Sequence, residues 1–161
     1  KRWYINDKIP SSPEYCLILF SSEIEFELKN RIKMNKLIID VASEKIFLMI
    51  ISNGSIYNIT HENTKINYEK LTIIINDFLL SKNIKITNIN AIYINQGSGS
   101  FAGIRNSMSV VKAFNVAKKI DYYCYNLDDF KDEKDISYEN IPNLCKKYKI
   151  KKNLINPVYL S

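Results

Sequence analysis

The residues best suited to do chemistry lie in one glycine-rich stretch, residues 95–105, which reads NQGSGSFAGIR. Three of the four glycines of the chain, Gly97, Gly99 and Gly103, fall within it. An apolar run precedes them and a helix-like pattern follows, so we expect a strand, a tight turn and a helix. Backbone N–H groups at the start of such a helix can face an anion or let another chain approach closely. Phosphate or nucleotide binding is therefore the chemistry to weigh against a purely structural turn.

The spacing Gly97-x-Gly99-x-x-Ala102 matches the dinucleotide-binding fingerprint, with Ala in the third place. That fingerprint normally occupies the first strand–helix unit of a sheet, whereas this one follows three predicted strands and a helix. A Walker A loop is excluded, because no Gly-Lys-Ser/Thr sequence follows. The structural alternative is that the glycines permit a tight turn and close helix–strand packing. A nucleotide-binding transferase or dehydrogenase that uses this loop therefore stays open as the alternative function.

Two charged residues belong to the same candidate site. Asp40 ends an apolar strand, the position where sugar-kinase and actin-like folds place a phosphate- or metal-facing acid. Because Val41-Ala42-Ser43 follows it instead of a glycine, a capped turn is the competing interpretation. Arg105 lies in the first turn of the predicted helix, where the helix dipole disfavours a cation. Its presence there indicates a carboxylate or phosphate partner, or a surface salt bridge.

Metal, thiol and membrane functions find little support in the composition. His61 is the single histidine, and we expect it in a polar loop. The three cysteines, at positions 16, 124 and 145, are far apart and form no CxxC pair, so we predict no metal site, no cofactor and no disulfide framework. No Ser–His or Cys–His motif supports a peptidase. We expect reduced thiols in a cytoplasmic protein, and no apolar run approaches the roughly 20 residues of a membrane span.

The chain is basic, with a formal net charge of +6 and a pI of about 9.1. A basic balance can indicate a polyanionic partner. Ile, Lys and Asn are frequent throughout, however, which favours a compositional origin for the excess of lysine. The basic run at residues 146–152 is either a solvated face or a contact for transfer RNA.

The predicted elements give an α/β fold class. Hydrophobic residues make up 46% of the chain, enough for a real core. Apolar runs predict strands, with Asn53-Gly54 as a hairpin turn, at residues 36–40, 45–51, 55–60, 89–95 and 120–126. Three- and four-residue apolar spacing predicts helices, at residues 68–81, 102–119 and 141–148, and residues 61–66 form a polar loop. The strand–helix–strand order around the glycine loop implies a parallel crossover.

We divide the chain into three parts, residues 1–33, 34–127 and 128–161. The first contains a short predicted strand and helix, and is either native or an extension that precedes a natural start at Met34. The second alternates strands and helices. The third is acidic and then basic, and it is too short to form a second domain.

With these residues in place, the chain resembles the bacterial TsaB (YeaZ) family. The family's loop reads approximately GPGSFTGxRxGxSxAKG. This chain matches it at Gly97, Gly99, Ser100, Phe101, Gly103, Arg105, Ser109, Lys112 and Ala113. The Leu37-Ile-Ile-Asp40 strand, the Asn53-Gly54 hairpin and the terminal Pro157-Val-Tyr-Leu160 add to the resemblance. Ser98 stands where the family has Pro, and Val41 replaces the usual Thr.

The resemblance implies an actin-like (sugar kinase/Hsp70-type) N-terminal lobe with a strongly shortened second lobe. It implies a non-catalytic dimerisation subunit of the machinery that makes N6-threonylcarbamoyladenosine in transfer RNAs reading ANN codons. TsaD, which transfers the threonylcarbamoyl group, would be the partner, and the ATPase TsaE would join a larger complex. Contact with transfer RNA would be indirect, and the same helices could also form a homodimer.

The family's first two helices pack against the partner, and they correspond here to residues 68–81 and 102–119. The residues expected at that interface are Leu71, Ile75, Phe78, Ile104, Met108 and Val111. The residues expected to form a structural or vestigial binding site around the glycine loop are Asp40, Gly97, Gly99, Ser100, Gly103 and Arg105.

Overall fold

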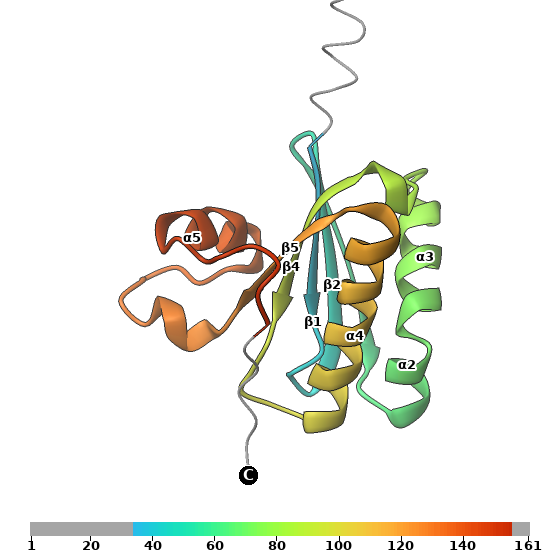
Figure 1. Cartoon of the computed structure of the whole chain (residues 1–161), viewed down its shortest axis with the longest axis horizontal. Helices are drawn as coiled ribbons and strands as arrows, with labels where there is room; N and C mark the ends of the chain where they lie inside the picture. Colours follow the sequence, from blue (N-terminus) through green and yellow to red (C-terminus); the bar gives the residue numbers. More distant parts are fainter. Residues whose placement is uncertain (1–33, 156–161) are drawn as a thin grey trace, which may run out of the picture. The chain divides into compact units, whose positions relative to one another are not determined.

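A computed structural model describes residues 34–155 of the chain. Its centre is one five-stranded sheet with the strand order β3-β2-β1-β4-β5 (Figure 1). The strands are β1 (Asn35–Asp40), β2 (Lys45–Ser52), β3 (Ser55–Glu62), β4 (Ile89–Asn95) and β5 (Asp121–Tyr125). All five lie where the apolar runs predict them. The interpretations of residues 1–33 and of Pro157–Leu160 fall outside the described residues.

The first three strands form an antiparallel meander, and the last two run parallel to β1. Asn53 and Gly54 both take positive φ angles, of 49° and 84°, as a two-residue hairpin turn requires. The parallel pairing of β4 with β5 confirms the expected crossover through the helix between them. The carboxyl ends of β1, β4 and β5 therefore meet at one edge of the sheet.

Three helices cover one face of the sheet (Figure 1). They are α2 (Lys65–Glu69), α3 (Leu71–Ser81) and α4 (Phe101–Lys118). The single helix predicted over residues 68–81 is in fact two, because Lys70 leaves the helical conformation and separates α2 from α3. The loop predicted at residues 61–66 is also wrong: β3 continues through His61, and Thr64 caps a helix that starts at Lys65. A short 3-10 turn, η1 (Ile86–Asn88), precedes β4.

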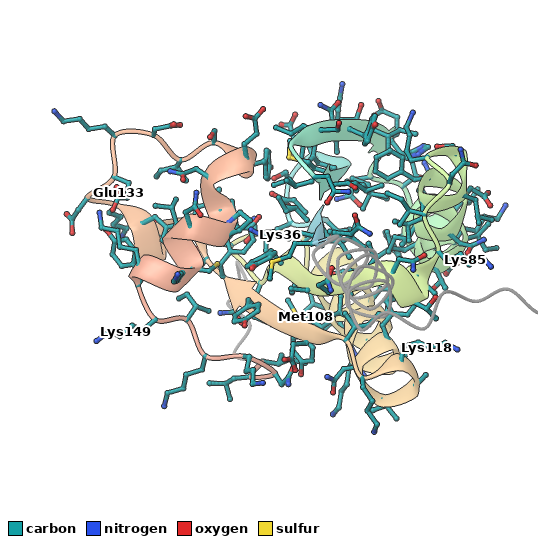
Figure 2. The ribbon with its side chains drawn as sticks, turned by 90° about the horizontal axis from the view of Figure 1, so that it is seen from above. Lys36, Lys85, Met108, Lys118, Glu133 and Lys149 are labelled. Atoms are coloured by element: carbon teal, nitrogen blue, oxygen red, sulfur yellow. The ribbon has the colours of Figure 1, made fainter. Side chains whose placement is uncertain are left out.

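The C-terminal segment covers the opposite face of the sheet (Figure 1). It holds the 3-10 turns η2 (Leu127–Phe130) and η3 (Tyr138–Asn140) and the helix α5 (Ile141–Lys147), the last close to its predicted bounds. Alternation along β1 sends Leu37 and Ile39 toward the helices and Ile38 toward this segment. The sheet is thus buried on both sides, with Phe130 and Leu144 filling the second core. Figure 2 shows Glu133 and Lys149 on this side, and Lys85 and Lys118 on the helical side.

Candidate functional site

Asp40, at the end of β1, is completely buried and is the centre of a hydrogen-bonded cluster. Its Oδ1 accepts from the backbone N–H groups of Ala42 at 2.9 Å and Ser43 at 3.3 Å. Its Oδ2 accepts from the Ser43 hydroxyl at 3.2 Å and from Asn95 Nδ2 at 3.0 Å. This is the capped turn that the sequence left as an alternative, and it gives the buried carboxylate the hydrogen bonds that compensate for lost hydration.

Tyr138 closes the cluster from the side of the C-terminal segment. Its hydroxyl donates to Asp40 Oδ2 at 2.7 Å, and its ring stacks on Phe47 with 4.1 Å between the centroids. Burial, and then the charge of Asp40, raise the pKa of Tyr138 above its ordinary value. The pKa of the fully buried Tyr125 is raised by the same two causes. Both phenols therefore stay protonated at neutral pH, but only Tyr138 donates to the carboxylate, because the Tyr125 hydroxyl has no hydrogen-bond partner among the described residues.

Asn95 connects this cluster to the glycine loop. While its Nδ2 donates to Asp40, its Oδ1 accepts from the Gly97 backbone N–H at 3.2 Å. The ends of β1 and β4 are therefore joined through one buried amide side chain. Gln96, the next residue, donates its backbone N–H to the carbonyl of Tyr125 at 2.8 Å. This hydrogen bond connects the end of β5 to the joined ends of β1 and β4.

Gly99 and Gly103 are required because the Val41–Ala42 turn lies directly against them. A Cβ at Gly99 would lie 2.1 Å from the Ala42 carbonyl oxygen, and one at Gly103 would lie 2.7 Å from that of Val41. Both contacts involve backbone atoms, which cannot move aside cheaply. The loop glycines thus allow close packing of two turns, as the structural interpretation of the motif predicts. Ser100 accepts from the Gly103 N–H and caps α4.

Most of the predicted site residues therefore come together, with one exception. Asp40, Gly97, Gly99, Ser100 and Gly103 form one continuous cluster. Arg105 instead lies on the exposed surface of α4, with its guanidinium 6.0 Å from the centroid of the Phe101 ring.

Sequence reasoning missed Asn95 and Tyr138. Asn95 could have been predicted as a site residue, because it is a polar residue at the end of an apolar strand. Tyr138 gives no such signal, because it lies 98 residues from Asp40 in the chain.

Neither a metal cluster nor a membrane span is found among residues 34–155. No group of three or more His, Cys, Asp or Glu side chains in this range could hold a metal ion. Its helices are likewise too short or too polar to cross a bilayer.

The six residues expected at the partner interface are not available there. Each has at most 5% of its surface exposed, because they are the inward positions of α3 and α4 and pack on the sheet. The error has a simple physical cause: three- and four-residue apolar spacing identifies the face of a helix that its own core buries first. The buried residues are Leu71, Ile75, Phe78, Ile104, Met108 and Val111.

The outward faces of these helices nevertheless keep large apolar side chains. On α3, Ile73 is 58% exposed and Leu80 is 51% exposed. Seven residues separate them, which is close to two helical turns, so they share one stripe opposite the buried face. Phe101 and Val116 on α4, and Ile66 on α2, are also more than half exposed.

Comparisons with known proteins show the fold. No family model matches the sequence, and no curated protein matches it either. Among solved structures, YeaZ from Pseudomonas aeruginosa aligns with a TM-score of 0.54 and 18% identity. The alignment covers 58% of this chain and 44% of that protein. A second P. aeruginosa structure, described as an uncharacterized protein with similarity to peptidase YeaZ, aligns equally well over 43% of its length.

A third structure, T. thermophilus RuvC in complex with Holliday junction substrate, aligns with a TM-score of 0.45 and 9% identity, too low to carry information on function. The chain spans less than half the length of the two P. aeruginosa proteins. With its β3-β2-β1-β4-β5 sheet, it has the RNase H/actin-like α/β lobe of the YeaZ structures.

Proposed function

We propose that the chain is a non-catalytic scaffold that binds TsaD in the complex forming N6-threonylcarbamoyladenosine in transfer RNAs that read ANN codons. The YeaZ-like fold and the ordered match of the glycine loop to the TsaB pattern support this proposal. In this view residues 34–127 are the first lobe, and residues 128–161 stand where a longer second lobe would be. TsaE would join the larger complex, and transfer RNA would be contacted indirectly.

The observation that carries the proposal is the contrast between two surfaces. The strand-end cluster, where a fold of this kind would hold a ligand, is filled by the chain's own Asn95 and Tyr138. The outer surface of the helices instead leaves Ile73, Leu80 and Val116 more than half exposed. Large apolar side chains left exposed on neighbouring helices favour a protein-binding surface over a solvated one. The partner interface therefore belongs on the outward stripe of the helices, and the inward stripe belongs to the core.

The direct test is complex formation. Purified full-length chain and TsaD from the same cell are mixed at micromolar concentration and separated by size. We expect the two proteins to elute together, and separate elution would overturn the proposal. The same samples are melted with ATP and with NAD, since a ligand that binds the folded state raises its melting temperature. A raised temperature with either ligand would favour the nucleotide-binding alternative.

A further inference from the structure

The net charge of the chain is concentrated in its helical layer. Residues 65–119 contain eight Lys and Arg residues but only two acidic residues, Glu69 and Asp77, a net charge of +6. This equals the formal charge of the whole chain, so the remaining residues balance to zero. The basic residues themselves are spread evenly along the chain, since these 55 of the 161 positions hold eight of the 23 Lys and Arg residues; the segment differs from the rest in holding only two of the 17 acidic residues. The net positive charge of residues 65–119 therefore needs a structural explanation.

The cations of α4 lie on its outward face and have no acidic partner in the described part of the chain. Arg105 and Lys112 are seven residues apart and both exposed, so they share one stripe of the helix. Lys119, seven residues further on, is the exposed C-cap. The ion pairs among residues 34–155 all lie elsewhere, in the pairs Lys131–Asp128, Lys147–Glu133 and Lys152–Asp121. From its first residue to its C-cap, α4 contains no acidic residue.

The cationic stripe lies beside the apolar stripe of the neighbouring helices. Figure 1 shows α3 and α4 side by side on one face of the sheet, and Asn106 of α4 donates to the Tyr68 carbonyl of α2. Ile73 and Leu80 point outward from α3, while Arg105 and Lys112 point outward from α4. One surface thus presents an apolar row and a positive row.

We propose that the partner of this surface presents an apolar ridge to Ile73 and Leu80 and a row of carboxylates to Arg105 and Lys112. The inference rests on the proposed scaffold function and specifies the chemistry of the protein that docks there. Arg105 is the best placed of the cations, because its planar guanidinium can bind a carboxylate with two hydrogen bonds. Complementary charge of this kind selects the partner and speeds its association.

The same charges argue against two other occupants. A second copy docked through α4 would set its cations against those of the first copy, and such like-charge contacts are unfavourable. A nucleic acid would satisfy the cations, but it would leave the aliphatic side chains of Ile73, Leu80 and Val116 without a role. An acidic protein surface with an apolar centre satisfies both rows.

The test is charge reversal with a matched control. The variant Arg105→Glu/Lys112→Glu changes the helical layer, and the control Lys134→Glu/Lys151→Glu makes the same charge change on the exposed C-terminal segment. The Kd for purified TsaD is measured for the full-length chain at about 50 mM and about 300 mM NaCl. We expect wild-type binding to weaken with salt, the helical variant to bind at least about tenfold more weakly at low salt, and the control to stay within about twofold.

Each other outcome has a definite meaning. If wild type binds TsaD and the helical variant binds equally well, the carboxylate row is wrong while the scaffold function stands. If wild type does not bind TsaD, the scaffold function fails, and this inference fails with it. Sedimentation of wild type as a dimer that the helical variant dissociates would assign the surface to a second copy. Tight binding of bulk transfer RNA that only the helical variant loses would assign it to nucleic acid.

Discussion

The hydroxyl of Tyr138 lies 2.7 Å from the carboxylate of Asp40 and connects two parts of the chain that are 98 residues apart. Asp40 ends the central strand, and Tyr138 belongs to the segment that covers the second face of the sheet. The carboxylate is completely buried, and none of the ion pairs among residues 34–155 involves it. Its stabilisation there comes from neutral donors, and within residues 34–155 Tyr138 is the only one that the C-terminal segment supplies.

Replacing Tyr138 by Phe should destabilise the fold. The ring can keep its stack on Phe47, while the buried carboxylate loses one donor, which typically costs about 1.5–3 kcal/mol of unfolding free energy. Urea denaturation measures the loss. Tyr148→Phe is the control, since its hydroxyl also donates to a carboxylate, that of Glu133, which is only partly buried and is also paired with Lys147. A loss for Tyr138→Phe no greater than that for Tyr148→Phe would contradict the role given to Tyr138.

Replacing Gly99 by Ala should destabilise the chain more strongly. The new methyl group would overlap the Ala42 carbonyl oxygen, and relief of the overlap must separate the two turns. We expect a loss of more than about 2 kcal/mol, at the upper end of the range for overpacking. Thermal unfolding followed by circular dichroism gives the result, with Ser98→Ala at the exposed neighbouring position as the control. Equal melting temperatures for the two variants would show that the turns are not packed as described.

The corrected assignment of the helix faces predicts opposite outcomes for two similar substitutions. Val111→Asp places an unpaired carboxylate in the core and should prevent folding, because the cost of several kcal/mol is comparable to the stability of a small domain. Leu80→Asp places the same group in solvent, where substitutions usually change stability by less than about 0.5 kcal/mol. Far-ultraviolet circular dichroism distinguishes the two. A folded Val111→Asp variant would restore the original interface assignment.

The buried thiols should make the fold sensitive to alkaline pH. Burial raises the pKa of Cys124 and of Cys145 to about 12, against about 8.5 in an unfolded chain. Below pH 8 both states hold the proton and the thiols contribute no pH dependence. As pH rises further the unfolded chain releases protons that the folded chain keeps, so the unfolding free energy falls, by about 1.4 kcal/mol per thiol at pH 9.5.

Urea denaturation at pH 8 and pH 9.5 checks this expectation. The Cys124→Ala/Cys145→Ala variant should lose less stability between the two pH values than wild type does. An identical loss in both proteins would assign the alkaline sensitivity to other groups.

The local sequence pattern was enough to predict the sheet, but it did not predict that Tyr138 of the C-terminal segment contacts Asp40. The strands around Asp40 and Asn95 each carry a continuous apolar run, and Asn53-Gly54 specifies its own turn, so short-range rules place them. The interruption between α2 and α3 at Lys70 could not be predicted, because no proline or glycine lies there. The contact of Tyr138 with Asp40 depends on how the C-terminal segment folds back, which no local pattern encodes.

The helix faces show a second limit of sequence reasoning. Periodicity identifies the apolar stripe of each helix that packs on the sheet, and it correctly places Leu71 on the stripe of α3 and Val111 on the stripe of α4. It does not say whether that face meets the chain's own sheet or another protein. Helical spacing places Ile75 and Ile73 on opposite sides of the helix, but only burial in the folded chain shows that Ile75 is inside and Ile73 is outside.

The most direct measurement is the affinity for TsaD of the variant Ile73→Ser/Leu80→Ser, obtained by calorimetric titration beside wild type. Ile56→Ser is the control, since Ile56 is exposed on β3 and pairs with Ile51, which belongs to the face opposite the helices. We predict that the double variant folds normally but binds at least about tenfold more weakly, because each buried apolar side chain contributes about 1.5–3 kcal/mol. Wild-type affinity in the double variant would contradict the account.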